Sequence, residues 1–337
     1  MLPTVSVIIP CYNEARTIRL LLQALYEQTY PQERMEVVIA DGMSTDATRR
    51  EIAAFSKAHP DLSVRVVDNP QRHIPAALNQ ALAAARGEII VRLDAHSVPR
   101  RDYVAHCVAD LQAGRGDNVG GIWEILPGAD TRTGRGIALA AAHPLGVGDA
   151  RYRYADQAAA VDTVPFGAFY RSLVERIGSF DENLLTNEDY EFNTRVRQNG
   201  GTVWLNPAIR ARYYARPTLR ALARQYWRYG FWKWKMLRRY PATLRWRQAL
   251  PPLFVLALLL LPILGIWLPA ARLLWLLQAG TYLLALTFIA LSTAWRQRSF
   301  LTGLSTALAI ATMHLTWGSA FLWSMVDDGR WTMDGRR

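Results

Sequence analysis

Acidic side chains recur at three points in the first two-thirds of the chain, each within a short polar run. Asp41 lies in Asp-Gly-Met-Ser-Thr-Asp, Asp94 in Leu-Asp-Ala-His, and Asp189 in Asn-Glu-Asp-Tyr-Glu. Asp41 and Asp94 follow Val/Ile-rich runs, which places both at the carboxyl ends of predicted parallel strands, where open α/β sheets collect their ligands. Three carboxylates at one edge suggest a metal ion, a nucleotide and a base for proton transfer.

Asp94 and His96 are candidate metal ligands. They lie two residues apart at a strand exit, so both can face a bound cation. Mg²⁺ or Mn²⁺ is commonly held by one or two protein groups together with a diphosphate, and the ion would neutralise charge on a departing diphosphate. His96 favours Mn²⁺ because imidazole is a borderline ligand. The alternative is that His96 only hydrogen-bonds a phosphate or a neighbouring carboxylate.

Glu188 and Asp189 begin a predicted helix over residues 188–198, which Gly200 and Gly201 close. Carboxylates are electrostatically favoured at a helix N-terminus, so capping alone could explain both residues. The functional interpretation makes Asp189 a general base that takes a proton from an attacking hydroxyl.

The loop after the first predicted strand offers groups that suit a nucleoside: an amide, a carboxylate and an aromatic ring. Its candidate binding residues are Pro10, Tyr12, Asn13 and Glu14. Asp41, at the next strand end, can accept a hydrogen bond from a nucleobase N–H. The alternative for residues 41–46 is a turn in which Asp46 caps the following helix. Arg72 is either a phosphate-side group or a surface charge.

The elements that must position these residues alternate between strand and helix. This alternation predicts an α/β fold with a mainly parallel, doubly wound sheet. The predicted strands cover residues 5–9, 36–40, 62–67, 88–93 and 203–205, and the predicted helices include 45–58, with Ser44 or Thr45 as N-cap, and 75–85. Residues 114–162 are rich in Gly and Ala, and we expect strands and mobile loops there.

The net charge of +11 is concentrated in one segment. Residues 210–249 carry 12 Lys/Arg and no Asp/Glu, interleaved with Trp, just before an apolar tail. That position predicts a collar facing anionic lipid and argues against nucleic acid as the partner. With only 2 Cys, the chain has no disulfide framework, which fits a reducing compartment.

The last third of the chain predicts a membrane anchor. Residues 217–239 predict an amphipathic helix in the membrane interface, or alternatively a helix packed on the domain core. Apolar stretches near 250–268, 273–292 and 300–325 are each long enough to span a bilayer. The arginines before the first stretch and between the second and third should be cytoplasmic, which puts the C-terminus outside. A re-entrant hairpin is the alternative for one stretch.

Gln225 and Arg228 lie three residues apart, on one face of the predicted interface helix. Arg228 could bind a diphosphate through its planar fork, or it could contact lipid headgroups.

In this order, the motifs resemble those of family 2 glycosyltransferases, inverting nucleotide-sugar enzymes of the GT-A fold. Phe166-Gly167-Ala168-Phe169 resembles the family's acceptor-side loop, which adds Gly167 and Phe169 as candidates, and Gln225-x-x-Arg228-Tyr229 resembles its Gln-x-x-Arg-Trp motif. Two departures are His96 in place of a second Asp and Tyr229 in place of Trp. A His-Pro-Leu-Gly-Val-Gly run at 143–148 is similar to membrane-anchored enzymes of succinoglycan-type exopolysaccharide synthesis.

The resemblance implies transfer of a hexose from a nucleotide diphosphate sugar, UDP-linked, to a hydroxyl of a polyprenyl-diphosphate-linked glycan, with Mn²⁺ or Mg²⁺. Asp189 would be the base, beside Glu188, on a catalytic domain at the cytoplasmic face of the inner membrane. Alternatives are transfer to a polyprenyl monophosphate, processive polymer synthesis, or an inactive membrane adaptor. The expected regions are 1–215 (catalytic), 216–248 (interface helices), 249–326 (about three spans) and 327–337 (polar tail).

Overall fold

The computed structural model describes residues 2–243 and 245–327, which group into two compact units. The sheet unit comprises Met1–Glu124 and Arg151–Tyr213, and the helical unit comprises Ile125–Ala150 and Tyr214–Arg337. The predicted catalytic region, residues 1–215, includes residues 125–150, which belong to the helical unit. The expected polar tail lies, from residue 328 on, outside the described residues.

The sheet unit is built on a mixed sheet whose first four strands are parallel. Strand order in the described chain is β3-β2-β1-β4-β8-β6-β9-β5, and β7 pairs with β9. The parallel strands are β1 (Val5–Cys11), β2 (Met35–Asp41), β3 (Ser63–Asp68) and β4 (Ile89–Arg92). The others are β5 (Val98–Pro99), β6 (Asn118–Leu126), β7 (Ala159–Ala160), β8 (Ala168–Tyr170) and β9 (Val203–Tyr214). The predicted α/β class is confirmed.

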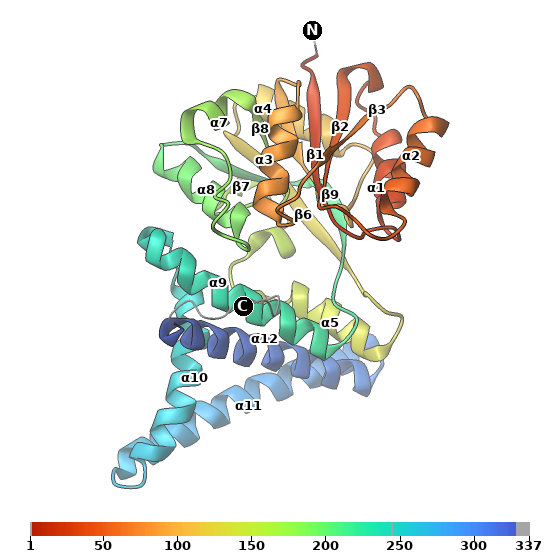
Figure 1. Ribbon diagram of the computed structural model, residues 1–337. Coiled ribbons are helices and arrows are strands. Elements are labelled where there is room, and N and C mark those ends of the chain that lie inside the picture. Colours follow the sequence, from red (N-terminus) through yellow and green to blue (C-terminus); the bar gives the residue numbers. More distant parts are fainter. Residues whose placement is uncertain (1, 244, 328–337) are drawn as a thin grey trace. The chain divides into compact units, whose positions relative to one another are not determined.

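Helices cover both faces of this sheet (Figure 1). One face carries α1 (Ile18–Tyr26), α2 (Thr48–Ala58) and α4 (Tyr103–Gln112), and the other carries α3 (Ile74–Ala84), α7 (Arg171–Ile177) and α8 (Glu188–Gln198). Side chains alternate along each strand. Val7 therefore packs into one core and Ile8 into the other. A hydrophobic core on each face thus holds the sheet in place, and the polar loops leave from one edge of it.

The end of β1 and the start of α2 differ from the sequence-based expectations. β1 continues to Cys11, because Pro10 is buried and pairs with Ala40 in parallel register. α2 begins at Thr48 and not at residue 45, since the Ser44 hydroxyl, expected to cap the helix, donates to Asp41 instead. The Asp46 carboxylate accepts from the Thr48 N–H at 2.9 Å, and the N-cap residue of α2 is Ala47.

The segment expected to hold mobile loops contains β6, α5 (Arg132–Ala142) and α6 (Pro144–Val147). Its glycines serve close packing. A Cβ at Gly136 would lie 2.6 Å from the Ser305 Cβ, so α5 approaches α12 (Phe300–Val326) at a point that only glycine fits. The small residues that made this segment look irregular therefore form a helix-packing surface.

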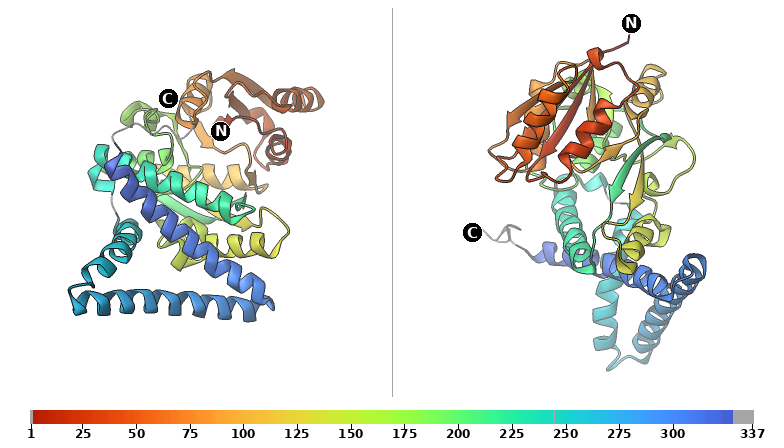
Figure 2. Two further views of the ribbon diagram at one scale, coloured as in Figure 1. Left: turned by 60° about the horizontal axis from the view of Figure 1, so that its bottom comes forward. Right: turned by 90° about the vertical axis from the view of Figure 1, so that its right-hand side faces the viewer.

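The helical unit also contains α9 (Leu219–Arg239), α10 (Trp246–Leu264), α11 (Pro269–Gln297) and the short turn η3 (Pro241–Thr243). α10, α11 and α12 are long and apolar enough to cross a membrane. α9 and α12 lie side by side (Figures 1 and 2), with the Trp234 and Phe321 rings 5.5 Å apart and the Lys235 Nζ 3.4 Å from an Asp327 carboxylate oxygen. The face of α9 opposite its most exposed residues is therefore covered by α12.

Candidate active site

The carboxyl ends of β1, β2 and β4 bring the polar loops to one edge of the sheet. Parallel register pairs Cys11 with Asp41 and Ile8 with Arg92. The chain then leaves β1 toward Tyr12 and leaves β4 toward Asp94. The predicted nucleotide loops and the predicted metal-binding residue consequently share the edge at which α/β sheets bind ligands.

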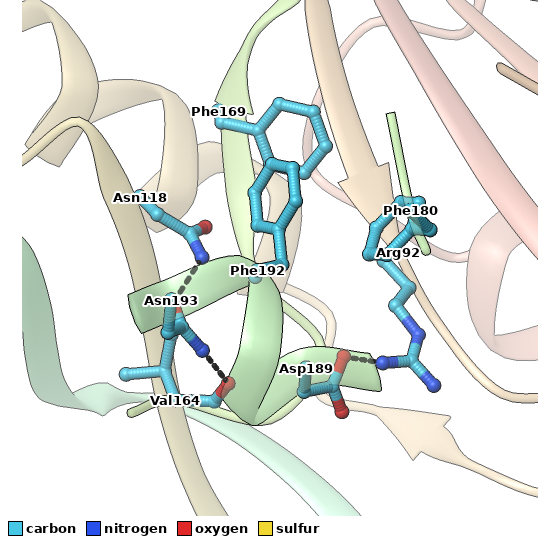
Figure 3. A pocket seen from close by; sticks show the side chains of 9 residues that line it. Arg92, Asn118, Val164, Phe169, Phe180, Asp189, Phe192 and Asn193 are labelled. Carbon is cyan, nitrogen blue, oxygen red and sulfur yellow. Dashed lines mark hydrogen bonds and ion pairs between the residues drawn. The ribbon is translucent and has the colours of Figure 1, made fainter. Parts of the chain in front are cut away.

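A buried arginine gathers the acids at this edge. Arg92, the last residue of β4, is 2% exposed. Its Nη2 lies 3.1 Å from the Asp94 Oδ1 and 2.9 Å from the Glu188 Oε1. Its Nη1 pairs with the Asp189 Oδ1 (Figure 3). Residues almost a hundred positions apart in the sequence therefore meet around one guanidinium, which offsets charge that would otherwise be unbalanced on burial.

The first turn of α8 divides its two acids between the interior and the surface. Asn187 precedes the helix in the left-handed conformation, with φ 72°. The Glu188 side chain is 9% exposed, whereas that of Asp189 is 28% exposed. Asp189 is therefore the acid of this pair that a substrate hydroxyl can reach.

Buried contacts hold α8 in place behind these acids. The Asn193 carboxamide accepts from the Asn118 Nδ2 at 2.6 Å and donates to the Val164 carbonyl at 3.0 Å. The Phe192 ring lies 5.0 Å from that of Phe169, centroid to centroid (Figure 3). Asp189, the candidate base, thus lies on a helix that is held to the core by the Asn193 carboxamide and the Phe192 ring.

The two loops expected to hold a nucleoside are joined by hydrogen bonds. Asn13 has a left-handed backbone with φ 55°, its N–H donates to the Ser44 hydroxyl at 2.8 Å, and its Oδ1 accepts from the Thr45 N–H at 2.8 Å. The Glu14 N–H donates to the Thr48 hydroxyl at 2.8 Å. Asn13 therefore shapes the pair of loops through its main chain and its carbonyl oxygen.

Asp41 lies deeper than the sequence analysis expected. Its side chain is 0% exposed. Its oxygens accept from the Ser44 N–H at 3.0 Å and the Arg49 Nε at 2.5 Å. In this arrangement Asp41 organises the second loop, and a nucleobase reaches it only if that loop or Arg49 moves.

The other nucleotide candidates differ in exposure. The Tyr12 ring covers Gly42, where an added Cβ would lie 3.2 Å from the Tyr12 Cδ2, and Tyr12 itself is 45% exposed. Arg72 is exposed on the loop after β3, with φ 59°. Pro10 contributes to the core of β1 and offers no surface for a ligand. Tyr12 and Arg72 are thus accessible to a nucleotide, and Pro10 is not.

The charges around Arg92 fit a divalent cation bound through Asp94. Three carboxylates surround one guanidinium, which leaves two negative charges in excess. The Asp94 side chain is 22% exposed, so an ion can reach it. The His96 Nδ1 lies 3.3 Å from the Glu14 Oε1, which is the carboxylate contact predicted as its alternative role. Within residues 2–243 and 245–327, no group of three His, Cys, Asp or Glu could hold a metal ion by itself. One carboxylate completed by diphosphate oxygens remains a normal Mg²⁺ or Mn²⁺ arrangement.

The predicted acceptor-side loop, residues 166–169, contacts the backbone of Arg92. The Gly167 carbonyl accepts from the Arg92 N–H at 3.0 Å. A Cβ at Gly167 would lie 2.2 Å from the Asn118 Oδ1, so a larger residue does not fit. Phe169 is 1% exposed, and it lines a small pocket together with Arg92 and Asp189.

Gln225 and Arg228 both lie on α9, in the helical unit. The Gln225 Nε2 donates to the Tyr229 hydroxyl at 2.9 Å, and Arg228 is exposed. The geometry described above is therefore that of the sheet unit alone.

Sequence reasoning missed Arg92 as a site residue. The available signal was a cation inside the run Ile-Ile-Val-Arg-Leu, which predicts a buried strand. A charge in such a run requires a buried partner.

Comparison with known proteins decides the family. Residues 6–178 match the sequence model described as glycosyl transferase family 2. The chain belongs to glycosyltransferase family 2. This glycosyltransferase is 31% identical to the succinoglycan biosynthesis protein ExoA of Rhizobium meliloti (strain 1021), over 95% of this chain and 94% of the relative. The resemblance inferred from the motifs is thereby confirmed.

Two further comparisons bear on this glycosyltransferase. It is 27% identical, over 75% of its length and 79% of the relative, to the dolichyl N-acetyl-alpha-D-glucosaminyl phosphate 3-beta-D-2,3-diacetamido-2,3-dideoxy-beta-D-glucuronosyltransferase of Methanococcus voltae. Its structure is similar to the mannosyltransferase PcManGT from Pyrobaculum calidifontis in complex with GDP-Man and Mn²⁺. That similarity has a TM-score of 0.61 and 26% identity, over 93% of this chain and 88% of the other. The GT-A-type fold is therefore shown together with the family, and the three apolar helices fit membrane anchoring.

Proposed function

We propose that this glycosyltransferase moves a hexose from a UDP-linked sugar to a hydroxyl of a polyprenyl-diphosphate-linked glycan, with inversion at the anomeric carbon. The observation that carries the proposal is the convergence of Asp94 and Asp189 on Arg92 at the ligand-binding edge of the sheet. Two relatives support the acceptor class, since one is named for succinoglycan biosynthesis and the other for action on a dolichyl phosphate sugar.

In this proposal Asp189 is the general base. Its partly exposed carboxylate takes the proton of the acceptor hydroxyl as that oxygen attacks the anomeric carbon. The bond to the nucleoside diphosphate breaks on the opposite face, so the configuration inverts and the diphosphate departs with the bonding electrons. Glu188, which is buried beside Arg92, keeps the start of α8 in place through its contact with the Arg92 Nη2.

The donor lies along the loops after β1, β2 and β4. Tyr12 and Glu14 form the nucleoside side, Asn13 and Asp41 shape the two loops that carry it, and Arg72 lies near the phosphates. Asp94 would bind Mn²⁺ or Mg²⁺ together with the diphosphate, and the ion when bound neutralises charge on the leaving group. His96, which contacts Glu14 and follows Asp94 by two residues, is the second candidate ligand for the ion.

The acceptor is presented at a membrane. Gly167 lies on the acceptor side, and Gln225 and Arg228 on α9 belong to the acceptor and diphosphate side. The apolar helices of the helical unit anchor the protein in the cytoplasmic membrane, with the sheet unit facing the cytoplasm, where nucleotide sugars are made.

Replacing the base tests the proposal. Asp189→Asn should lower the rate of transfer by about 10³-fold or more, while nucleotide-sugar affinity changes by less than about threefold. The measurement uses the full-length protein in lipid nanodiscs with Mn²⁺, a panel of UDP- and GDP-sugars, and a synthetic polyprenyl-diphosphate sugar. The matched control is Glu175→Gln, at an exposed carboxylate on α7.

Transfer at a near-normal rate by Asp189→Asn would show that the base assignment is wrong. Using polyprenyl monophosphate as the acceptor in parallel separates the two lipid-linked reactions. Wild-type product lengths distinguish a single addition from processive synthesis.

A further inference from the structure

We propose that Arg92 is a positioning residue that fixes the base carboxylate of Asp189 and the donor-side carboxylate of Asp94 in one arrangement. The inference rests on the proposed function, because it assigns Arg92 a role in that same transfer. Arg92 acts on the reaction through these two carboxylates and does not touch the reacting atoms.

Arg92 has the geometry for such a role because its backbone N–H, its terminal nitrogens and one face of its guanidinium all have neighbours. Its backbone N–H donates to the Gly167 carbonyl at 3.0 Å. Its guanidinium carbon lies 6.0 Å from the centroid of the Phe166 ring. An arginine whose fork and planar face are both engaged presents fixed donors, unlike a lysine, whose ammonium is a point charge on a flexible stem.

The surface that supports Arg92 is itself strained. Phe166 adopts φ 52°, a left-handed conformation that is rare for a bulky residue. The buried Tyr103 hydroxyl donates to the Phe166 carbonyl at 2.9 Å, and the Trp123 ring packs 5.6 Å from the Phe166 ring. Strained residues persist where surrounding contacts enforce them, and they cluster at functional sites. Here the strained residue places an aromatic face under Arg92.

The charges explain why a positioning residue is needed here. Asp94, Glu188 and Asp189 would repel one another at this distance without a shared cation. Arg92 contacts all three and holds them close together, with the Asp94 carboxylate on the donor side and the Asp189 carboxylate on the acceptor side. Removal of Arg92 should therefore disturb the alignment of donor and base more than the affinity for the nucleotide.

The experiment compares Arg92→Lys and Arg92→Met with a matched control. Arg195→Met removes another arginine that pairs with an α8 carboxylate, Glu191, and lies over a phenylalanine ring, Phe192, at 5.4 Å. Arg195 is not part of the proposed machinery. kcat and donor KM are measured with Mn²⁺, the donor that the wild type uses and the synthetic polyprenyl-diphosphate sugar, and nucleotide affinity is measured with UDP.

We expect Arg92→Met to lower kcat by about 10²-fold or more, with donor KM and UDP affinity within about threefold of the wild type. Arg92→Lys keeps the charge but loses the fork, so its kcat should lie between those of Arg92→Met and the wild type. Arg195→Met should alter thermal stability and leave kcat within about threefold.

Wild-type kcat in Arg92→Met, or in Arg92→Lys, would overturn the inference. If Arg92→Met does not fold, Arg92→Lys decides the question alone. Failure of the inference is distinct from failure of the proposed function, because the latter is tested by Asp189→Asn. An inactive Asp189→Asn beside a fully active Arg92→Met would remove only the role given to Arg92.

Discussion

At the scale of single residues, the two cysteines behave as buried, neutral thiols. Cys11 is 5% exposed and Cys107 is 0% exposed. Burial raises the pKa of the Cys11 thiol, and the negative charges of Asp41, Glu14 and Asp46 raise it further. Burial also raises the pKa of the Cys107 thiol. Because the thiolate is the reactive form, both thiols should be inert near neutral pH.

We therefore expect slow alkylation of the folded protein at pH 8. A higher pKa means less thiolate at a given pH, so reactivity should appear only in more alkaline solution or after unfolding. Mass spectrometry after iodoacetamide treatment measures this, with free glutathione in the same tube as the reactive control. Alkylation of either cysteine in native protein as fast as that of glutathione would contradict the prediction.

The candidate acids could be predicted from the sequence, but their counter-ion could not. Asp94 and Asp189 stand in polar runs at predicted element ends, which local patterns reveal. The pairing of Arg92 with Glu188 joins β4 to α8, which lie far apart in the sequence, and depends on the strand order of the sheet. The same limit applies to Asp41, whose buried carboxylate pairs with Arg49.

At the scale of elements, glycines decide how closely the apolar helices pack. A Cβ at Gly303 would lie 2.1 Å from the Ala290 carbonyl oxygen, where α12 crosses α11. At Gly280, also on α11, no described atom outside the neighbouring backbone of that helix lies within 4 Å of the added Cβ. One glycine is therefore a contact requirement, and the other is replaceable.

Gly303→Ala should destabilise the helical unit by about 1–3 kcal/mol, because overpacking forces the helices apart. Gly280→Ala should be neutral or stabilising by up to about 1 kcal/mol, because alanine favours helix. Thermal unfolding of both variants in the same nanodiscs provides the comparison. Equal melting temperatures for the two variants would show that this helix contact does not limit stability.

Element types were predictable where one pattern dominated. The Val/Ile runs gave β1, β2 and β4 to within about two residues. β9 was expected to cover three residues and covers twelve, because alternating arginines on its outward side concealed a regular buried row of Val203, Leu205 and Ile209. α5 was missed because its small residues are selected for close approach to α12 and resemble a loop in composition.

At the scale of the whole molecule, the packing of α12 bears on membrane topology. α9 carries basic residues along its length, which prevents it from crossing a bilayer. Gly230 lies against Trp317, and Lys235, further along α9, lies against Asp327 at the end of α12. Residue numbers therefore rise in the same direction along both helices, which run side by side and parallel. We therefore expect α12 to lie at the surface with α9, and the end of α12 to be cytoplasmic.

Cysteine labelling measures this topology. Trp267→Cys, between α10 and α11, should react with a membrane-impermeant maleimide in intact cells. Arg298→Cys and Val326→Cys should react only after the membrane is opened. The native thiols give a low background because they are buried. Labelling of Val326→Cys in intact cells would instead support a third crossing, with the C-terminus outside as the apolar stretches alone suggested.

The polypeptide passes between the sheet unit and the helical unit three times, after Glu124, Ala150 and Tyr213. A chimera with a related enzyme that joins the chains at one point near residue 215 would separate α5 from α12, and Ile137 and Ala140 would lose the neighbours that bury them. Recombination that preserves folding must exchange residues 125–150 and the chain from 214 on together. A helical unit can thus be transferred from one related enzyme to another only if both of its chain segments are exchanged together.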